Sequence, residues 1–385
     1  MHRGRWLLFL FAATVQASTT VPFKPSEYSK ETAHCKATRR GVDVEKEVDI
    51  QLKYVDINPE ASTTLLLVHG WPSLWSSWSN QIQEFKEDYH LVVPDLRGFG
   101  ESTHPGDVPS SSTIPDMVGD LVCILENAKV ESAVCVGHDW GSSICYEAAR
   151  SRPDKFTAVV GIDVPYIPAA GHFVPIENFL TIVPSLTYQL FFDYKTDEAV
   201  AELDRDIRRT VRATLRTVAS APPASFLQSR GSFLGAWKDI KEIDPVPFFS
   251  PEEEDYFVEQ YSIQGFRNTL GFYSTQNRKL GYELAHSQGN YTLTLPVLAI
   301  YPTNDPVANW SFLAAILKSA AYLENLTTEL VPGAHWPQLE FPDETNKAIR
   351  KWLDGLKEAI TEEDVVVVED QEDVQEHHGH FEDEL

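Results

Sequence analysis

The sequence feature that most constrains the fold is a short stretch between an apolar run and a segment of helical spacing, Gly137-His138-Asp139-Trp140-Gly141. Residues 133–136 have the continuous apolar character of a buried strand, and residues 142–151 have helical spacing. A sharp turn from a strand into a helix needs small residues on both sides, which Gly137 and Gly141 supply. The stretch therefore predicts a unit of a parallel sheet in which Asp139 stands above the end of a strand.

The alternation of strands and helices continues along the chain. After a loose N-terminal stretch, strands are predicted at residues 48–57, 64–68, 89–94, 133–136, 156–164, 295–301 and 328–331. Helices are predicted at residues 75–87, 117–128, 142–151 and 342–356. This order predicts an α/β fold with a mostly parallel sheet.

The alternation stops at Pro165. Residues 166–285 contain aromatic residues, prolines and amphipathic helical stretches such as residues 197–218, but few runs typical of strands. We therefore expect a helical lid at residues 166–285, inserted into an α/β core that comprises residues 18–165 and 286–360.

A turn of this type between a strand and a helix is called a nucleophile elbow, and its central residue is usually serine, in the pattern Gly-x-Ser-x-Gly. Here the central residue is Asp139, and no Gly-x-Ser-x-Gly occurs in the chain. Attack by serine on an sp³ carbon would give an ether, which water does not easily cleave. Attack by a carboxylate gives an ester, which water can cleave at the carbonyl. Asp139 therefore favours substitution at carbon followed by ester hydrolysis, and the alternative is a buried aspartate that caps the following helix.

Two further residues follow predicted strands in the order nucleophile, acid, histidine. Asp305 comes directly after the strand at residues 295–301, and His335 follows the strand at residues 328–331. His335 would activate the hydrolytic water, and Asp305 would orient the His335 imidazole. Asp163 also follows a buried strand and is the rival acid, but we favour Asp305.

The backbone N–H groups of Trp71 and Trp140 are the expected oxyanion hole, since both residues lie in tight turns at strand ends. We expect the Trp71–Pro72 peptide bond to be cis, because a fixed turn there would aim the Trp71 amide.

With these residues, the chain resembles the soluble-type epoxide hydrolases of the α/β-hydrolase fold, over residues 45–355. The resemblance is carried by His69-Gly70-Trp71-Pro72, Asp95-Leu96-Arg97-Gly98, Gly137-His138-Asp139-Trp140-Gly141, Asn304-Asp305 and Gly333-Ala334-His335-Trp336. It implies an α/β-hydrolase fold, a mostly parallel sheet with an inserted helical lid.

In this family two lid tyrosines act as acids toward the epoxide oxygen, and the resemblance carries these roles to Tyr188 and Tyr273. Tyr188-Gln189-Leu190 is similar to the first lid segment, and Gly265-Phe266-Arg267 with Phe272-Tyr273 is similar to the second. The second segment departs from the family at Asn268, Thr269, Gly271 and Ser274.

The resemblance implies hydrolysis of a lipophilic epoxide to a vicinal diol, with water as the second reactant and no metal or cofactor. A haloalkane dehalogenase of the same fold is one alternative, although that family more often has Asn where Trp71 follows Gly70. A lumenal ligand-binding protein without activity is the other. The net charge of −25 argues against nucleic acid as a partner, and the expected chemistry does not require a membrane.

Both termini carry targeting features. Residues 1–17 have a basic start, an apolar core and small residues before a cleavage site, as in a signal peptide; an uncleaved membrane anchor is the alternative. Residues 361–385 contain eleven acidic residues and no Lys or Arg, which predicts a disordered tail. The tail ends in Glu382-Asp383-Glu384-Leu385, similar to an endoplasmic reticulum retention signal, and sequons start at Asn290, Asn309 and Asn325.

Four cysteines are present, and none forms a metal-type Cys-x-x-Cys pair. Cys123, Cys135 and Cys145 fall in predicted core elements, so we expect them to be small buried apolar residues, and we expect no disulfide framework.

Overall fold

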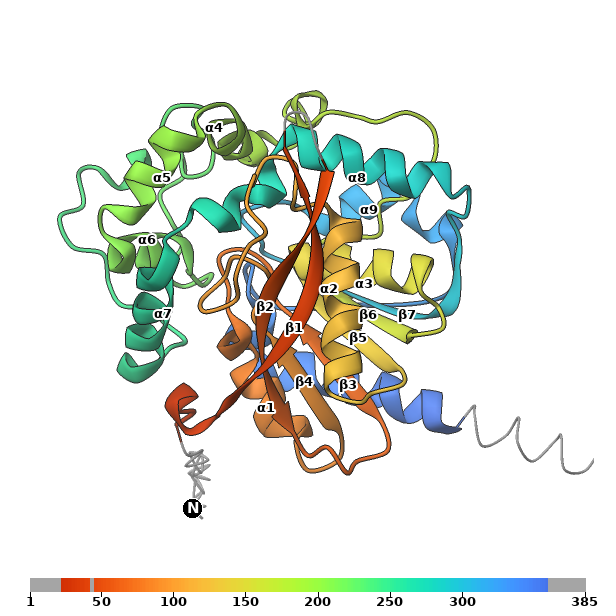
Figure 1. Cartoon of the computed structure of the whole chain (residues 1–385). Coiled ribbons are helices and arrows are strands. Elements are labelled where there is room, and N and C mark those ends of the chain that lie inside the picture. The colour runs from red at the N-terminus through yellow and green to blue at the C-terminus, as the bar shows by residue number, and fades with distance from the viewer. Residues whose placement is uncertain (1–21, 42–44, 359–385) are drawn as a thin grey trace, which may run out of the picture.

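The computed structural model describes residues 22–41 and 45–358. In them, eight strands form one sheet of order β1-β2-β4-β3-β5-β6-β7-β8 (Figure 1). Their bounds are β1 Lys30–Arg40, β2 Glu45–Ile57, β3 Thr64–Val68, β4 His90–Pro94, β5 Ala133–His138, β6 Phe156–Ile162, β7 Leu293–Pro302 and β8 Leu323–Val331. β2 is antiparallel to β1 and to β4, and the other neighbours are parallel. This confirms the predicted α/β class and its mostly parallel sheet. The predicted signal peptide and acidic tail lie outside the described residues.

The sheet lies between two layers of helices, because its central strands are apolar on both faces. Leu66 and Val68 of β3 pack in the cluster that includes α2 (Ile114–Asn127) and α3 (Trp140–Ser151). Leu65 and Leu67 face the opposite cluster, with α1 (Ser79–Phe85) and the helix at residues 342–358. Figure 1 shows α2 and α3 in front of the strands. None of the helices in the described residues has the length and apolar character needed to cross a membrane.

The chain between β6 and β7 forms helices and 3₁₀ turns, which lie mainly at the top and upper left in Figure 1. The helices are α4 Tyr188–Tyr194, α5 Thr196–Asp204, α6 Ile207–Thr214, α7 Pro251–Gln264 and α8 Thr275–Ser287, and the 3₁₀ turns are η3 Ile176–Phe179, η4 Pro184–Thr187, η5 Gly235–Trp237 and η6 Arg267–Tyr273. The remaining elements outside this segment are η1 Pro25–Glu27, η2 Trp75–Trp78, α9 Trp310–Leu317, η7 Ser319–Tyr322 and α10 Pro337–Glu340.

The single helix predicted at residues 197–218 is wrong. The chain breaks between α5 and α6, because the Asp206 side chain accepts a hydrogen bond from Arg209 N at 2.9 Å and so caps a new helix.

The N-terminal stretch that looked loose is a full edge strand, β1, paired with β2 along its length. Its buried face is made of the small residues Ala33, Cys35 and Ala37, between polar residues. Small side chains give a weak alternation signal, which is why the sequence did not predict this strand.

The expectation of unpaired cysteines is also wrong. Cys35 of β1 is bonded to Cys123 of α2, with Cα atoms 5.9 Å apart, and Cys135 of β5 is bonded to Cys145 of α3, with Cα atoms 5.4 Å apart. The first pair could not be expected without β1, which carries one of its two residues. The second pair forms because the turn at Asp139 folds α3 back along β5.

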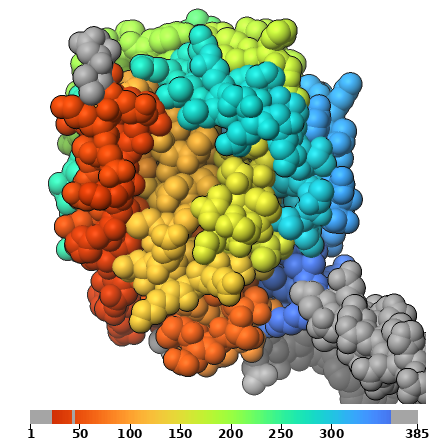
Figure 2. Space-filling model, turned by 45° about the vertical axis from the view of Figure 1, so that its right-hand side comes forward, coloured from red at the N-terminus to blue at the C-terminus, as the bar shows by residue number. Residues whose placement is uncertain are grey.

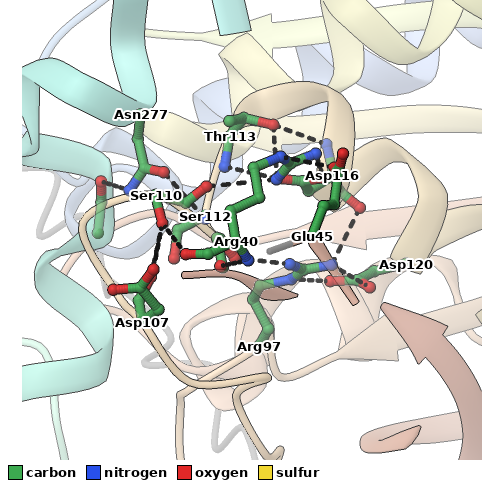
Figure 3. Close-up of polar contacts among 12 residues, drawn as sticks. Arg40, Glu45, Arg97, Asp107, Ser110, Ser112, Thr113, Asp116, Asp120 and Asn277 are labelled. Carbon is green, nitrogen blue, oxygen red and sulfur yellow. Dashed lines mark hydrogen bonds and ion pairs between the residues drawn. The ribbon is translucent and has the colours of Figure 1, made fainter. Parts of the chain in front are cut away.

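One buried and one partly buried ion pair hold the loop between β4 and α2 (Figure 3). Arg97 is 2% exposed and donates to both carboxylate oxygens of Asp120, at 2.5 and 2.6 Å. Arg40 of β1 reaches both oxygens of Asp116, in the first turn of α2. Removing one partner of such a pair would leave a buried charge unpaired, so Arg97 in the Asp95-Leu96-Arg97-Gly98 motif fixes α2 against β4.

Asp95 in the same motif fixes the loop after β3. Its Oδ1 accepts a hydrogen bond from Trp75 N at 3.0 Å, and its Oδ2 lies 2.8 Å from Lys30 Nζ. The loop that carries Trp71 is thereby tied to β4 and β1.

Candidate active site

A strained turn presents Asp139 between β5 and α3. Asp139 has φ 54° and ψ −120°, a conformation that L residues rarely adopt. A Cβ atom on Gly137 would lie 2.3 Å from the oxygen of Gly141, and one on Gly141 would lie 2.1 Å from the oxygen of Val68. Both glycines are therefore required for the close approach of helix and strands.

The Asp139 carboxylate lies between an amide and a histidine. Oδ1 accepts a hydrogen bond from Trp71 N at 2.9 Å, and Oδ2 lies 3.6 Å from His335 Nε2. Burial opposes the charge, but the hydrogen bond and charge of His335 outweigh it and lower the pKa of Asp139. The side chain makes no hydrogen bond that caps α3, so the alternative of a helix cap does not describe it.

The two amides expected at the oxyanion hole flank Asp139. The Trp71–Pro72 peptide bond is cis, as expected. Trp140 is the first residue of α3, so its N–H has no acceptor within its own helix. The Trp71 indole donates to Thr269 Oγ1 at 3.0 Å, which ties this loop to the segment between β6 and β7.

His335 and Asp305 come together as the sequence predicts. His335 Nδ1 donates to Asp305 Oδ2 at 2.7 Å. Burial opposes a charged imidazole, but the charges of Asp305 and Asp163 outweigh it and raise the pKa of His335 well above its usual value. A second donor, Trp310 Nε1, also reaches Asp305 Oδ2 and holds this carboxylate in place.

Asp163, the rival acid, lies in the same cluster. Its Oδ2 is 3.3 Å from His335 Nδ1 and 2.7 Å from His138 Nε2. Its side chain is fully buried, and burial raises the pKa of Asp163 to about 6. The structure thus places Asp305 closer to His335 but leaves Asp163 in contact. No role was predicted for His138, whose Nε2 donates to the His335 carbonyl at 2.7 Å.

Replacing Asp163 by asparagine is expected to stabilise the fold at pH 7.5 more than at pH 4.5. Below the unfolded pKa of 3.8, Asp163 is protonated in both states, and above about 6 only the folded state carries a desolvated charge. Stability is therefore lost as pH rises between these values, by up to roughly 3 kcal/mol. Urea unfolding at both pH values measures the effect, with the exposed Asp354→Asn as the control. An equal change at both pH values would contradict the assignment.

Tyr188 and Tyr273 face each other, with ring centroids 5.6 Å apart. Burial, followed by the charge of Asp139, raises the pKa of Tyr188. Burial, with Tyr188 and Asp139 adding to it, raises the pKa of Tyr273 well above its usual value. Both phenols therefore remain protonated at neutral pH and can donate to an oxygen that gains charge beside Asp139.

Within residues 22–41 and 45–358, one cluster has the donor types of a metal site: ligand atoms of His138, Asp163 and His335 lie within 4.8 Å of one another. The nitrogens that face the cluster already donate, His138 Nε2 to the His335 carbonyl and His335 Nδ1 to Asp305. The donor set therefore fits an internal hydrogen-bond network better than an open cation site.

The fold and the elbow at Asp139 define an α/β hydrolase, and residues 63–342 match the family model described as alpha/beta hydrolase fold. The chain is 30% identical to epoxide hydrolase A of Mycobacterium tuberculosis, across 82% of this chain and 99% of the relative. It is 28% identical to epoxide hydrolase 3 of Siraitia grosvenorii, across 75% of this chain and 91% of the relative. The crystal structure of epoxide hydrolase A from Mycobacterium thermoresistibile is similar, with a TM-score of 0.68, 26% identity, and coverage of 84% of this chain and 98% of that one. The chain therefore belongs to the epoxide hydrolase family of the α/β-hydrolase fold.

Proposed function

We propose that this protein hydrolyses a lipophilic epoxide to a vicinal diol through an ester on Asp139. The observation that carries the proposal is the position of the Asp139 carboxylate, which is held by Trp71 N at 2.9 Å and faces His335 Nε2 at 3.6 Å. The phenols of Tyr188 and Tyr273 are protonated and lie close enough to Asp139 for its charge to raise the pKa of both. A cavity of about 480 Å³, lined mainly by apolar side chains, opens from Asp139 and Tyr188 and suits an apolar substrate.

In the first step, Asp139 Oδ2 attacks an epoxide carbon. The bond from that carbon to the ring oxygen breaks as the ester bond forms, and the ring oxygen takes a proton from Tyr188 or Tyr273. Asp139 Oδ1 becomes the ester carbonyl oxygen and keeps its hydrogen bond from Trp71 N.

In the second step, water hydrolyses the ester, with His335 as the base. Formation of the ester removes the hydrogen bond between the Asp139 carboxylate and His335, which is one of the interactions that raise the pKa of His335. The His335 imidazolium then loses its proton more readily. The neutral imidazole that forms accepts a proton from water, while Asp305 stabilises the imidazolium that results. The amides of Trp71 and Trp140 would stabilise the negative oxygen of the tetrahedral intermediate. When this intermediate collapses, the bond between the Asp139 carboxyl carbon and the diol oxygen breaks, and that oxygen takes the proton from His335. The Asp139 carboxyl then gives up its proton, which restores the tyrosine phenol, and the diol leaves.

The test is the intact mass of His335→Gln after exposure to a panel of epoxides and haloalkanes. Without its base the variant is expected to stall at the ester and to gain the mass of a whole epoxide, on the peptide that contains Asp139. His172→Gln is the control, because His172 is exposed at the cavity mouth, and this variant should turn over without a stable adduct.

A gain equal to a haloalkane less its halogen acid would overturn the proposal in favour of a dehalogenase. An epoxide adduct on a residue other than Asp139 would overturn the assigned nucleophile. No adduct from either panel, with diol formation also absent in the wild type, would support a ligand-binding role instead.

We also propose that the protein works in the secretory pathway, in the endoplasmic reticulum lumen. Two disulfides support this proposal, because disulfides persist in oxidising compartments. The sequon residues Asn290, Asn309 and Asn325 are exposed in the structure. Protein from its native cells is expected to lose mass on treatment with an endoglycosidase; an unchanged mass together with free thiols would contradict a lumenal location.

A further inference from the structure

The substrate cavity contains a positive charge that neither ester formation nor ester hydrolysis requires. Among its lining residues, five carry ionisable charges: Asp139, Glu147, His172, Arg278 and Lys318. Asp139 faces His335, and both oxygens of Glu147 accept hydrogen bonds from Arg150. His172 and Lys318 are exposed at the mouth. Arg278 is partly buried and is therefore the cation that lies deeper in the cavity.

The Arg278 guanidinium lies beside the reaction centre. It stands 5.2 Å from the ring centroid of Trp140, which directly follows Asp139, and 5.9 Å from that of Tyr273. Its Nε donates to the Phe272 carbonyl at 2.9 Å, and its Nη2 donates to Gln189 Oε1 at 2.6 Å. Both acceptors are uncharged, and Nη1 makes no hydrogen bond within the described chain.

Arg278 also has no ion-pair partner among residues 22–41 and 45–358, since no carboxylate oxygen lies within 4.0 Å of it there. Asp193 and Glu177 act on it only from a longer distance. Each has its own donor, because Asp193 accepts two hydrogen bonds from Thr275 and Glu177 accepts one from Tyr194. Burial lowers the pKa of Arg278, as expected for a cation that has lost water without gaining a counter-charge.

Asn277, the residue next to Arg278, anchors the first turn of α8. Figure 3 shows Asn277 of α8 directed at the loop before α2. Asn277 Oδ1 accepts from Ser112 N at 3.1 Å, and Nδ2 donates to the Val108 and Gly271 carbonyls. In Figure 2, α8 (teal) lies across the top of the face formed by α2, which it contacts. The first turn of α8 is therefore fixed, and the guanidinium is positioned before any ligand arrives.

We propose that Arg278 is an anion receptor and that the epoxides this protein takes carry a carboxylate a few bonds from the ring. A guanidinium pairs with a carboxylate through two parallel N–H donors, and a desolvated guanidinium gains most from such a partner. One unpaired cation at this depth matches a single negative charge, whereas a phosphate monoester would need a second. Because the Arg278 guanidinium lies beside Trp140 and Tyr273, the carboxylate of the substrate must be only a few bonds from the epoxide ring. The proposal rests on the proposed function for the epoxide, but not for the anion.

The first test measures binding without chemistry. Wild-type protein is titrated by calorimetry with hexanoate and with hexanamide, which differ in charge but hardly in shape. Hexanoate is expected to bind roughly 10- to 100-fold more tightly, in the range of a charged hydrogen bond. Arg278→Gln should remove the difference and Arg278→Lys should restore part of it. Lys279→Gln, on the exposed side of α8, should change nothing.

The second test compares turnover of a short epoxy acid with its methyl ester. Arg278→Gln is expected to lower kcat/KM for the acid by roughly 10- to 100-fold, mainly through KM, and to leave the ester unchanged. Equal binding of hexanoate and hexanamide by the wild type, or equal losses for acid and ester, would overturn the anion receptor. Selective hexanoate binding with no turnover of either epoxide would uphold the receptor and overturn the proposed function instead.

Discussion

Replacing Asp139 by alanine is expected to abolish diol formation, with a fall in kcat of at least roughly 10⁴-fold. The variant has no carboxylate to form the ester, and the water that His335 would activate then has no ester to attack. The expected result is measured as diol released from a racemic epoxide under single-turnover conditions.

Ser143→Ala is the matched control, because Ser143 lies on the same turn of α3 and lines the same cavity. It should retain turnover within a few-fold of wild type. Circular dichroism must show that both variants are folded. Diol formation by folded Asp139→Ala at more than about one hundredth of the wild-type rate would mean that water opens the ring directly, with His335 as base and without a covalent step.

The second large effect is expected for Tyr188→Phe combined with Tyr273→Phe. Opening of the ring creates an alkoxide, and loss of both acids should lower the rate of ester formation by roughly 10²- to 10⁴-fold. Each single variant should lose less, because one phenol remains. Quenched-flow measurement of the ester, rather than of the diol, isolates this step.

Tyr282→Phe is the control for that experiment. Tyr282 lines the same cavity from α8, and its hydroxyl makes no hydrogen bond within the described residues, so its loss should leave ester formation unchanged. If the double variant forms ester as fast as the wild type, these tyrosines are packing residues only, and another group must protonate the alkoxide.

The strands that pack on both faces could be predicted well from the sequence. The strand predicted at residues 64–68 coincides with β3, and the one at residues 89–94 is one residue longer than β4. Such strands are continuous apolar runs because helices cover both faces. The sharp turn at Asp139 could also be predicted, from the glycines on both sides of it. They are needed because the close contact of α3 with β3 and β5 leaves no space for a Cβ.

The edges of the sheet and the choice of acid were harder. β8 spans Leu323–Val331, but only its last four residues were predicted, because the strand is at the edge and five of its nine residues are exposed. Asp163 and Asp305 both follow buried strands, and what favours Asp305 as the partner of His335 is its shorter distance to Nδ1, 2.7 Å against 3.3 Å. A difference in distance this small depends on side-chain packing and cannot be predicted from the spacing of the residues along the sequence. Arg278 was missed because a lone arginine in a polar helix carries no sequence signal until its neighbours are known.

The bond between Cys135 and Cys145 encloses Asp139 in a covalent ring, with a sequence separation of ten between its two cysteines. In the denatured chain this ring remains closed, so the two ends of the turn stay neighbours when the rest of the sheet is lost. Closing so short a ring lowers the conformational entropy of the denatured chain. This raises the free energy of the denatured state by about 3 kcal/mol. After thermal unfolding, an oxidised chain thus begins refolding with Asp139 already inside a closed disulfide loop. A dithiol that opens the ring would remove this advantage and leave the surface of the substrate cavity untouched.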